Sequence, residues 1–435
     1  MATQLATDSL RPAESPHRKR TVCRTCGGDR LRPFLSLGPV PLANSFLRSG
    51  QEFAEEPSYP LDVYLCEQCF LVQLLDVIDA EVLFRNYIYV TGTSDTMAAH
   101  NAHYARSVVQ ALALGPRDLV VEVASNDGSL LQCFRRCGVR TLGVEPARSI
   151  AEQACASGID TLSDFFDPAV AARIRNTRGP ARAVVANNVL AHVDEPRDFL
   201  AGCRHLLADD GLVVVEVPYL RDLLDRLEYD TIYHEHLSYF SAAALMRLCD
   251  ASGLRVVRLD RLPVHGGSLR LYAAPRRSAD PHSDDARRLA EQEHQAGLQD
   301  FALYQRFARD VDANRRRLRA LLHGLRDEGY AVAGYGAPAK GNTLLNYCGI
   351  DPRLLPYTVD KNPWKVGLFT PGAHIPVLPV STLIERQPDY VLLLAWNFAD
   401  EIQRQQQPYR DRGGRFIVPI PDPKIIHSPN PAGAL

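Results

Sequence analysis

The stretch "LVVEVASNDGSLL", Leu119 to Leu131, decides the fold of this chain. Its first half is an apolar, β-branched run that predicts a buried strand, and the polar turn after it leads into a helical pattern. Further strand and helix patterns alternate after it: "TLGVEP", "RAVVANNVL" and "LVVVEVP" for strands, "SLLQCFRRCG" and "PRDFLAGCRHLLADDG" for helices. This alternation predicts an α/β fold in which helices cover both faces of a parallel sheet.

The 435 residues are enough for two or three domains. Residues 21–80 combine short strands with turns rich in Pro and Gly, and they hold two cysteine pairs, so we expect a small metal-binding module. Residues 81–280 contain the alternation described above, which predicts that they form the central domain. Residues 281–435 begin with one or two long connecting helices and continue with a second alternation, which predicts a smaller C-terminal α/β domain.

Charge is nearly balanced, with 49 basic and 51 acidic side chains, so the chain lacks the electrostatic footprint of a nucleic-acid-binding protein. Nothing in the sequence predicts a membrane segment. The opening "MATQLATDSLRPAESPHRKR" has no apolar core typical of a signal peptide. We therefore expect a cytoplasmic location, and we expect a monomer.

Two C-x-x-C pairs give the strongest signal for a metal site. Each pair has the two-residue spacing that lets both thiolates reach one tetrahedral zinc ion, and four sulfurs leave no open position for water. We expect a structural zinc ion held by Cys23, Cys26, Cys66 and Cys69. The pairs lie further apart than in a zinc ribbon, so four unrelated buried thiols remain the alternative.

Polar residues at the first strand-to-helix turn indicate a bound nucleoside. Glu122, Asn126, Asp127 and Gly128 lie at this turn, and Glu145 ends the next strand, where a carboxylate can bind both ribose hydroxyls. The turn lacks the G-x-G-x-x-G pattern of dinucleotide folds, which favours S-adenosylmethionine over NAD. At the third strand, "LSDFF" supplies a carboxylate and a ring for adenine from Asp164 and Phe165. An ordinary turn with solvated acids is the alternative.

The segment "TIYHEHLSYF", Thr231 to Phe240, lies beyond the carboxyl end of a strand, where open α/β sheets bind ligands. A two-histidine metal site is one alternative, but the pattern is not H-E-x-x-H and no third ligand lies at a characteristic spacing. The stretch "HGGS", His265 to Ser268, resembles an esterase oxyanion loop, yet no G-x-S-x-G elbow accompanies it.

The C-terminal stretch "GYGAPAKGN" supports a rival function. Gly334, Gly336 and Gly341 follow a predicted strand and begin a helix, as in a nicotinamide-binding turn. An NAD(P)-dependent nucleotide-sugar oxidoreductase is therefore the main alternative. A scaffold protein with an inactive core is the other.

Taken in order, ten motifs resemble those of the S-adenosylmethionine-dependent sugar C-methyltransferases that act on nucleotide-linked 4-keto deoxysugars. They are "VCRTCGG", "LCEQCF", "NYIYVTGTSDTM", "VEVASNDGSLL", "GVEPA", "NNVLAHVDEP", "IYHEHLSYF", "HGGSLRLY", "GYGAPAKGNTLLNY" and "DKNPWKVG". The resemblance spans Thr21 to about Pro423. It implies an N-terminal zinc-binding domain, a methyltransferase domain and a C-terminal Rossmann-like domain that together methylate C3 of a dTDP-linked 4-keto sugar in antibiotic or other natural-product biosynthesis.

The resemblance also implies roles for individual residues. His236 would be the base, Tyr233 would point its hydroxyl at the sugar, and Glu235 would orient the imidazole, while His234 stays structural. Tyr87 and His192 match further active-site positions. The remaining assignments are cofactor contacts from Ser125, Pro146, Asn187 and Asn188, and substrate contacts from Gly336, Lys340 and Asn342.

The chain departs from the family at Ala124, where the family usually has glycine. The added methyl group would shift the pose of the cofactor without removing its partners.

Overall fold

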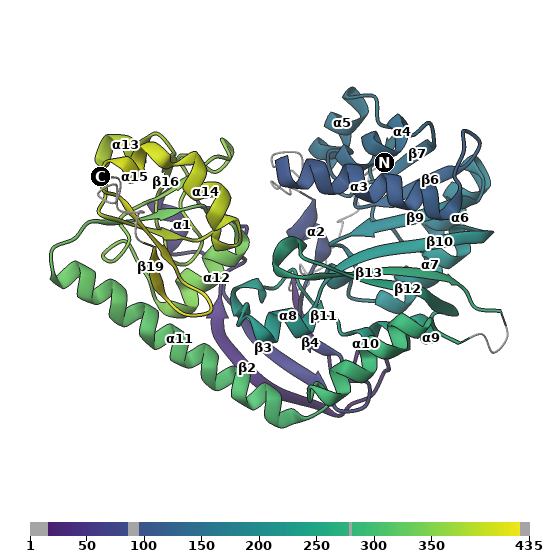
Figure 1. Ribbon diagram of the computed structural model, residues 1–435, viewed down its shortest axis with the longest axis horizontal. Helices are drawn as coiled ribbons and strands as arrows, with labels where there is room; N and C mark the ends of the chain where they lie inside the picture. The colour runs from purple at the N-terminus through teal and green to yellow at the C-terminus, as the bar shows by residue number, and fades with distance from the viewer. Residues whose placement is uncertain (1–15, 86–94, 278–280, 427–435) are drawn as a thin grey trace, which may run out of the picture.

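The computed structural model describes residues 16–85, 95–277 and 281–426. The central domain and the C-terminal domain form two lobes, the strands of the N-terminal module lie between and below them, and one long helix runs along the lower edge (Figure 1). Of the helices that these ranges contain, none has the length and apolarity needed to cross a bilayer.

A seven-stranded sheet in the order β12-β13-β10-β9-β6-β7-β8 forms the central domain. The parallel strands are β6 (Leu119–Val123), β7 (Arg140–Val144), β8 (Thr161–Leu162), β9 (Ala181–Asn187) and β10 (Leu207–Pro218). Two antiparallel strands, β13 (Ser268–Pro275) and β12 (Leu254–Leu262), extend one edge.

Helices cover both faces of this sheet, because successive strand residues point to opposite sides. Val184 joins a core with α6 (Pro168–Arg178), α7 (Pro196–Leu206) and α9 (Ala242–Ala251). Its neighbour Val185 joins a separate core with α3 (Asp95–Leu112) and α4 (Ser129–Arg136). Helix α5 (Arg148–Ala156) follows β7. The expected doubly wound α/β fold is confirmed.

The sequence-based boundary of α7 needs a correction. The helix expected over 196–211 ends at Leu206, and Leu207 already pairs with Ala181 as the first residue of β10. The register shifts between Leu207 and Leu212, so the intervening Asp-Asp-Gly segment is an irregularity within the strand and not helix.

The N-terminal module is built on a four-stranded antiparallel sheet in the order β11-β4-β3-β2. Its own strands are β2 (Leu31–Val40), β3 (Tyr59–Cys66) and β4 (Val72–Leu74), with β1 (His17–Lys19) and β5 (Asp76–Ile78) paired beside them. The fourth strand, β11 (Ser238–Tyr239), comes from the segment "TIYHEHLSYF" of the central region. Short helices α1 (Gly50–Phe53) and α2 (Ala80–Phe84) complete the module.

The C-terminal domain has a six-stranded sheet in the order β16-β15-β14-β17-β18-β19. All strands are parallel except the last: β14 (Val332–Tyr335), β15 (Thr358–Asp360), β16 (Val377–Pro379), β17 (Tyr390–Leu393), β18 (Arg415–Val418) and β19 (Lys424–Ile426). Helices α12 (Ala339–Cys348), α13 (Thr382–Arg386), α14 (Ala399–Gln405) and α15 (Gln407–Asp411) connect them.

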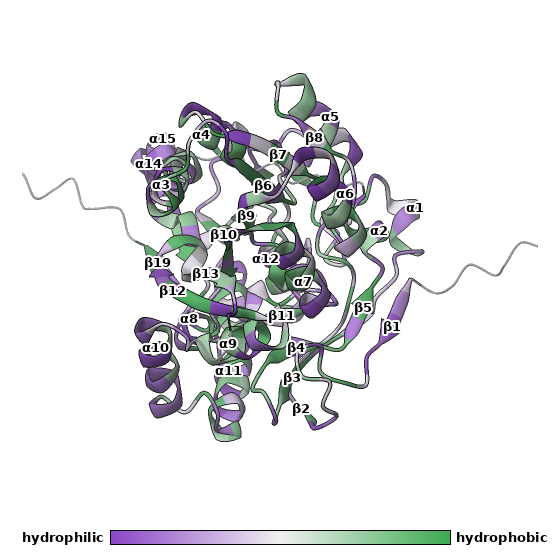
Figure 2. Ribbon diagram, turned by 90° about the vertical axis from the view of Figure 1, so that its right-hand side faces the viewer, coloured by the Kyte–Doolittle hydropathy of each residue, from purple (hydrophilic) through white to green (hydrophobic). Residues whose placement is uncertain are grey.

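Two helices connect the lobes. Helix α10 (Asp284–Gln295) packs on α9 and β12, whereas α11 (Phe301–Asp327) contacts β2, α12 and β14. Figure 2 shows hydrophilic purple over most of α10 and hydrophobic green in the interior strands. Buried residues of β2, α11 and the C-terminal sheet form one apolar cluster, which includes Leu35, Val311 and Leu392. This shared core fixes the N-terminal module and the C-terminal domain relative to each other.

Candidate active site

A cavity of about 1210 Å³ lies where the three regions meet. It opens at the carboxyl ends of the parallel strands in the central sheet, and residues that follow the carboxyl ends of β14 and β15 form its far wall. Ligands of α/β sheets bind at such edges. The walls comprise a cofactor wall from the central sheet, a middle section around His236, and a C-terminal wall.

Most residues expected to bind the cofactor line the cofactor wall. They are Glu122, Ser125, Asn126, Glu145, Pro146, Phe165, Asn187 and Asn188. Three others do not line the cavity. Asp127 accepts a hydrogen bond from the Ser129 amide at 3.1 Å, Gly128 caps α4, and Asp164 pairs with Arg173 at the surface.

Glu145 is held by the backbone of the turn that it faces. Its Oε2 accepts from the Asn126 amide and its Oε1 from the Ala147 amide, both at 2.8 Å. Burial raises the pKa of Glu145, and these two amide donors oppose that shift. Each carboxylate oxygen keeps a second lone pair, so the group can still bind a ribose diol.

The cofactor wall contains polar atoms that the protein itself leaves unpaired. Within the described residues, Glu122 Oε2, Ser125 Oγ and Asn187 Oδ1 are buried without a hydrogen-bond partner. Burial raises the pKa of Glu122 well above its usual range, and the nearby Asp127 and Glu145 carboxylates add to this shift. Buried polar atoms normally have partners, so this wall fits a polar ligand such as S-adenosylmethionine.

Ala124 adopts φ 50°, a left-handed conformation that strains any residue with a side chain. This explains why glycine suits the position. The residue lines the cavity together with Glu122 and Ser125.

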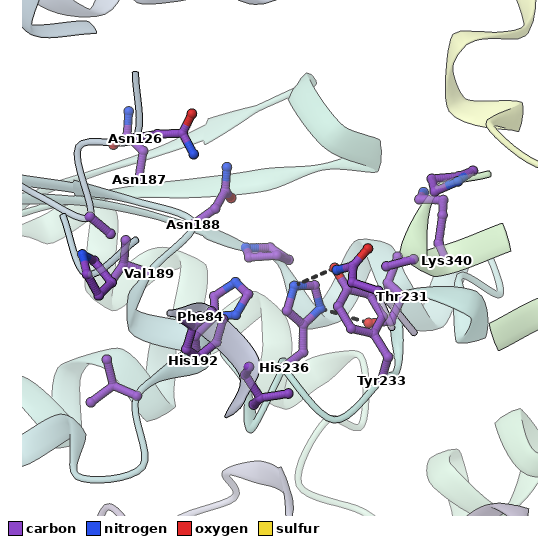
Figure 3. A pocket seen from close by; sticks show the side chains of 18 of the residues that line it. Phe84, Asn126, Asn187, Asn188, Val189, His192, Thr231, Tyr233, His236 and Lys340 are labelled. Carbon is purple, nitrogen blue, oxygen red and sulfur yellow. Dashed lines mark hydrogen bonds between the residues drawn. The ribbon is translucent and has the colours of Figure 1, made fainter. Parts of the chain in front are cut away.

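His236 lies in the middle of the cavity with both ring nitrogens engaged, as Figure 3 shows. Nδ1 lies 2.8 Å from the Thr231 carbonyl, and Nε2 lies 2.9 Å from the Tyr233 hydroxyl. A carbonyl only accepts, so Nδ1 carries the proton. Nε2 is then the basic nitrogen and accepts from the Tyr233 hydroxyl.

Glu235 is not positioned to orient the His236 imidazole, as we had expected. It does not line the cavity, and its Oε1 accepts from Asn44 Nδ2 at 2.6 Å. The Thr231 carbonyl occupies the position at Nδ1 that we had expected for Glu235. His234 is buried against the N-terminal module and pairs with the Pro60 carbonyl at 3.1 Å, as a structural histidine does.

His192 lines the cavity beside His236. The ring centroids of His192 and His236 lie 4.8 Å apart at an interplanar angle of 78°. Burial, with a smaller contribution from the nearby His236, lowers the pKa of His192 well below its usual range, so this imidazole stays neutral. Tyr87 lies outside the described residues.

The C-terminal wall carries Gly336 and Lys340, as expected, but not Asn342. The Asn342 side chain is fully buried and donates to the Ala43 carbonyl at 2.7 Å, so it joins α12 to the N-terminal module. Lys340 Nζ lies 4.7 Å from the Trp396 ring centroid and has no hydrogen-bond partner among the described residues.

Three further residues of this wall were not assigned from the sequence: Lys361, Lys365 and Trp364. Only five of the 49 basic residues are lysines, namely Lys19, Lys340, Lys361, Lys365 and Lys424. Three of these five line the same cavity. They also fall within residues 340–365, and this concentration of a rare residue type is the sequence signal that could have found them. Trp364 is 72% exposed at the cavity rim, the most exposed large apolar side chain among the described residues.

The four cysteines converge as the spacing predicts. Their sulfurs lie within 4.8 Å of one another, with Cys23 and Cys69 at 3.5 Å and Cys26 and Cys66 at 3.6 Å. A tetrahedral zinc ion with Zn–S bonds of about 2.3 Å needs sulfurs at this spacing. Cys66 of this cluster ends β3, and β4 of the same sheet pairs with β11, which begins two residues after His236.

Three family models match consecutive parts of the chain. "Putative zinc binding domain" matches residues 23–84, "Methyltransferase domain" residues 97–259, and "C-methyltransferase C-terminal domain" residues 263–421. The last match includes the Gly-rich turn, which places this turn in a methyltransferase and not in the alternative oxidoreductase.

The chain is 39% identical to the C-methyltransferase NovU of Streptomyces niveus over 404 residues, which are 93% of this chain and 96% of NovU. Two solved structures are more distant. Magnesium protoporphyrin IX methyltransferase from Synechocystis PCC 6803 is 15% identical and covers 43% of this chain and 88% of its own, with TM-score 0.32. CurJ carbon methyltransferase is 13% identical and covers 42% and 56%, with TM-score 0.33.

Proposed function

The chain belongs to the C-methyltransferase family, and from that premise we propose that it methylates C3 of a dTDP-linked 4-keto-6-deoxysugar in natural-product biosynthesis. The observation that carries this proposal is the position of the Tyr233–His236 pair, between the cofactor wall and the lysines of the C-terminal wall. A carbon nucleophile formed at this pair would have a methyl donor on one side and the nucleotide on the other.

S-adenosylmethionine supplies an electrophilic methyl group on a positively charged sulfur. The cofactor wall would hold it, with Glu145 binding the ribose hydroxyls and Phe165 beside the adenine. The unpaired atoms of Glu122, Ser125 and Asn187 offer further hydrogen bonds.

Removal of the C3 proton is the task of the Tyr233–His236 pair. The C4 ketone makes a neighbouring C–H acidic, because the electron pair left behind spreads onto the ketone oxygen as an enolate. The Tyr233 oxygen takes this proton while its own proton passes to Nε2 of His236. The Thr231 carbonyl, which accepts from Nδ1, stabilises the resulting imidazolium.

Methyl transfer then restores the C4 ketone, and the proton leaves His236 for solvent. His192 stays neutral beside this pair, so it adds no opposing positive charge when His236 becomes protonated.

The C-terminal wall suits the nucleotide end of the substrate. Ammonium groups of Lys340, Lys361 and Lys365 act as point charges for a diphosphate, and the exposed indole of Trp364 offers a face on which thymine can stack. Gly336, at φ 89°, allows backbone to approach the diphosphate closely.

Incubation of the pure enzyme with S-adenosylmethionine and a panel of dTDP-4-keto-6-deoxysugars tests the proposal. Mass spectrometry should show a gain of one methylene unit, and NMR should place the new methyl on C3. A methyl group on C5, the other carbon next to the ketone, would correct the position. Transfer to oxygen or nitrogen would overturn the proposal.

A further inference from the structure

Glu228 occupies a wall position that the methyl-transfer chemistry leaves unused. It directly precedes the 3-10 turn Tyr229–Thr231 and so lies three residues before the carbonyl that holds the base. It lines the cavity although it is only 4% exposed. Its Oε1 is buried and has no hydrogen-bond partner within the part of the chain that the structure describes. Buried polar atoms normally have hydrogen-bond partners, so this unpaired oxygen suggests that a ligand binds here.

The "HGGS" stretch, which serves no esterase chemistry here, makes room for this carboxyl. Gly266 has φ 92°, and a Cβ built on it would lie 2.4 Å from Oε2 of Glu228. A Cβ on Gly267, at φ 128°, would lie 2.2 Å from Oδ2 of Asp222. Any larger residue at position 266 would therefore push the Glu228 carboxyl out of its place in the wall, and one at position 267 would displace Asp222.

Charged groups from several elements surround Glu228. Lys340 on α12 and Arg226 after α8 (Leu220–Asp225) favour its ionised form, whereas Asp230 and Asp222 oppose it. Lys340 is also the residue to which we assign the diphosphate. Glu228 and the diphosphate therefore share one neighbour, Lys340.

We propose that Glu228 binds the substrate as a neutral carboxylic acid and donates a hydrogen bond to an oxygen of the diphosphate beside Lys340. The inference rests on the proposed dTDP-sugar substrate. Only the neutral form can donate, and an ionised carboxylate in this buried position would repel the diphosphate. Glu228 is thus a substrate-binding residue apart from the methyl-transfer machinery.

The titration of the group agrees with this role. Burial raises the pKa of Glu228 to about 8, so the acid form prevails at neutral pH. A dianionic ligand beside it favours the acid form further. Affinity for the diphosphate should therefore be complete below this pKa and should fall as pH rises through about 8.

Calorimetric titration with dTDP-glucose between about pH 7 and about pH 9.5 tests the inference without requiring activity, because a diphosphate diester keeps its charge over this range. Three proteins are compared: wild type, Glu228→Gln and Asp225→Asn. Asp225 is a half-exposed acid on α8 that pairs with Arg221, so its replacement removes a nearby charge without reaching the cavity.

Wild-type affinity should fall by about tenfold per pH unit above about pH 8, and binding near that pH should take up protons from the buffer. Glu228→Gln, which is neutral at every pH and can still donate, should keep its affinity up to high pH and take up none. Asp225→Asn should follow the wild type. Parallel pH curves for wild type and Glu228→Gln would overturn the inference, as would loss of binding at every pH in a folded Glu228→Gln. If the wild type does not bind dTDP-glucose at any pH, the result contradicts the proposed dTDP-sugar substrate, and with it this inference.

Discussion

The Tyr233 hydroxyl lies 2.9 Å from Nε2 of His236, and the imidazole is anchored on its other side by the Thr231 carbonyl at 2.8 Å. All three residues belong to one short segment. The imidazole and the hydroxyl are therefore positioned locally, whereas the cavity walls on either side of them come from distant parts of the chain.

Replacement of either member of this pair should affect turnover far more than binding. His236→Asn keeps the size of the side chain but cannot act as a base at neutral pH, so kcat should fall by about 100-fold to 10000-fold. Tyr233→Phe should cause a similar loss, and the double variant should lose little more, because the two residues act as a unit. Steady-state kinetics measure this, with calorimetry of cofactor and dTDP as the control. Near wild-type turnover in His236→Asn combined with an inactive Tyr233→Phe would show that Tyr233 removes the C3 proton without passing its own proton to His236.

Zinc should be needed for both stability and activity. Metal analysis should find about one zinc ion per chain, and Cys66→Ser should lose it, because Cys66 ends β3 and is fully buried. Since the module sheet also holds β11, activity should fall together with the melting temperature. Cys155→Ser, an exposed free cysteine on α5, is the matched control and should change neither. Full zinc content in Cys66→Ser would contradict the four-cysteine site.

Glu145 should control cofactor affinity. Glu145→Ala should weaken S-adenosylmethionine by about 1 to 3 kcal/mol, the cost of lost charge-assisted hydrogen bonds, while dTDP binding stays unchanged. Because burial raises the pKa of Glu145, the ionised form should be lost on acidification at a higher pH than for an ordinary glutamate, and cofactor affinity should fall there. Calorimetry at several pH values measures both effects. Unaltered affinity in the alanine variant would remove Glu145 from the cofactor site.

The lysines of the C-terminal wall should contribute to nucleotide binding. Lys340→Met should weaken dTDP by about tenfold, since a charge-assisted hydrogen bond to a phosphate is lost, and should make binding less sensitive to salt. Lys424→Met changes an exposed lysine on β19 that does not line the cavity, so it should bind as the wild type does. Equal affinities of these two variants, measured by calorimetry, would contradict the assignment.

Trp364 should report the arrival of the nucleobase. The chain has only two tryptophans, and Trp396 is held by a hydrogen bond from Nε1 to Asp230 at 2.6 Å. Addition of dTDP should therefore quench mainly the exposed Trp364, and Trp364→Ala should weaken binding by about 1 to 3 kcal/mol. Fluorescence titration of wild type against Trp364→Phe isolates this signal. Identical quenching in both proteins would show that the base stacks elsewhere.

Local chemistry in the sequence was enough to predict the four-cysteine cluster, the doubly wound sheet and the segment that brings Tyr233 and His236 to the cavity. A C-x-x-C pair limits its two sulfurs to one metal, an apolar run between turns limits its backbone to a strand, and residues 231–236 fix the imidazole through contacts within six positions.

The rest depended on how distant segments pack, which no local pattern encodes. Asp164 accepts a hydrogen bond from Arg173, Glu235 accepts one from Asn44, and Asn342 donates one to the Ala43 carbonyl. Each polar group pairs with the partner that the fold brings within reach. The same packing brings three of the five lysines to one wall and leaves Oε1 of Glu228 without a hydrogen-bond partner among the described residues, beside Gly266. The sequence by itself thus determined which chemical groups the protein carries, and the tertiary structure alone decided which of them face the cavity. The physical reason is that side-chain orientation follows from the burial of apolar surface between elements far apart in the chain.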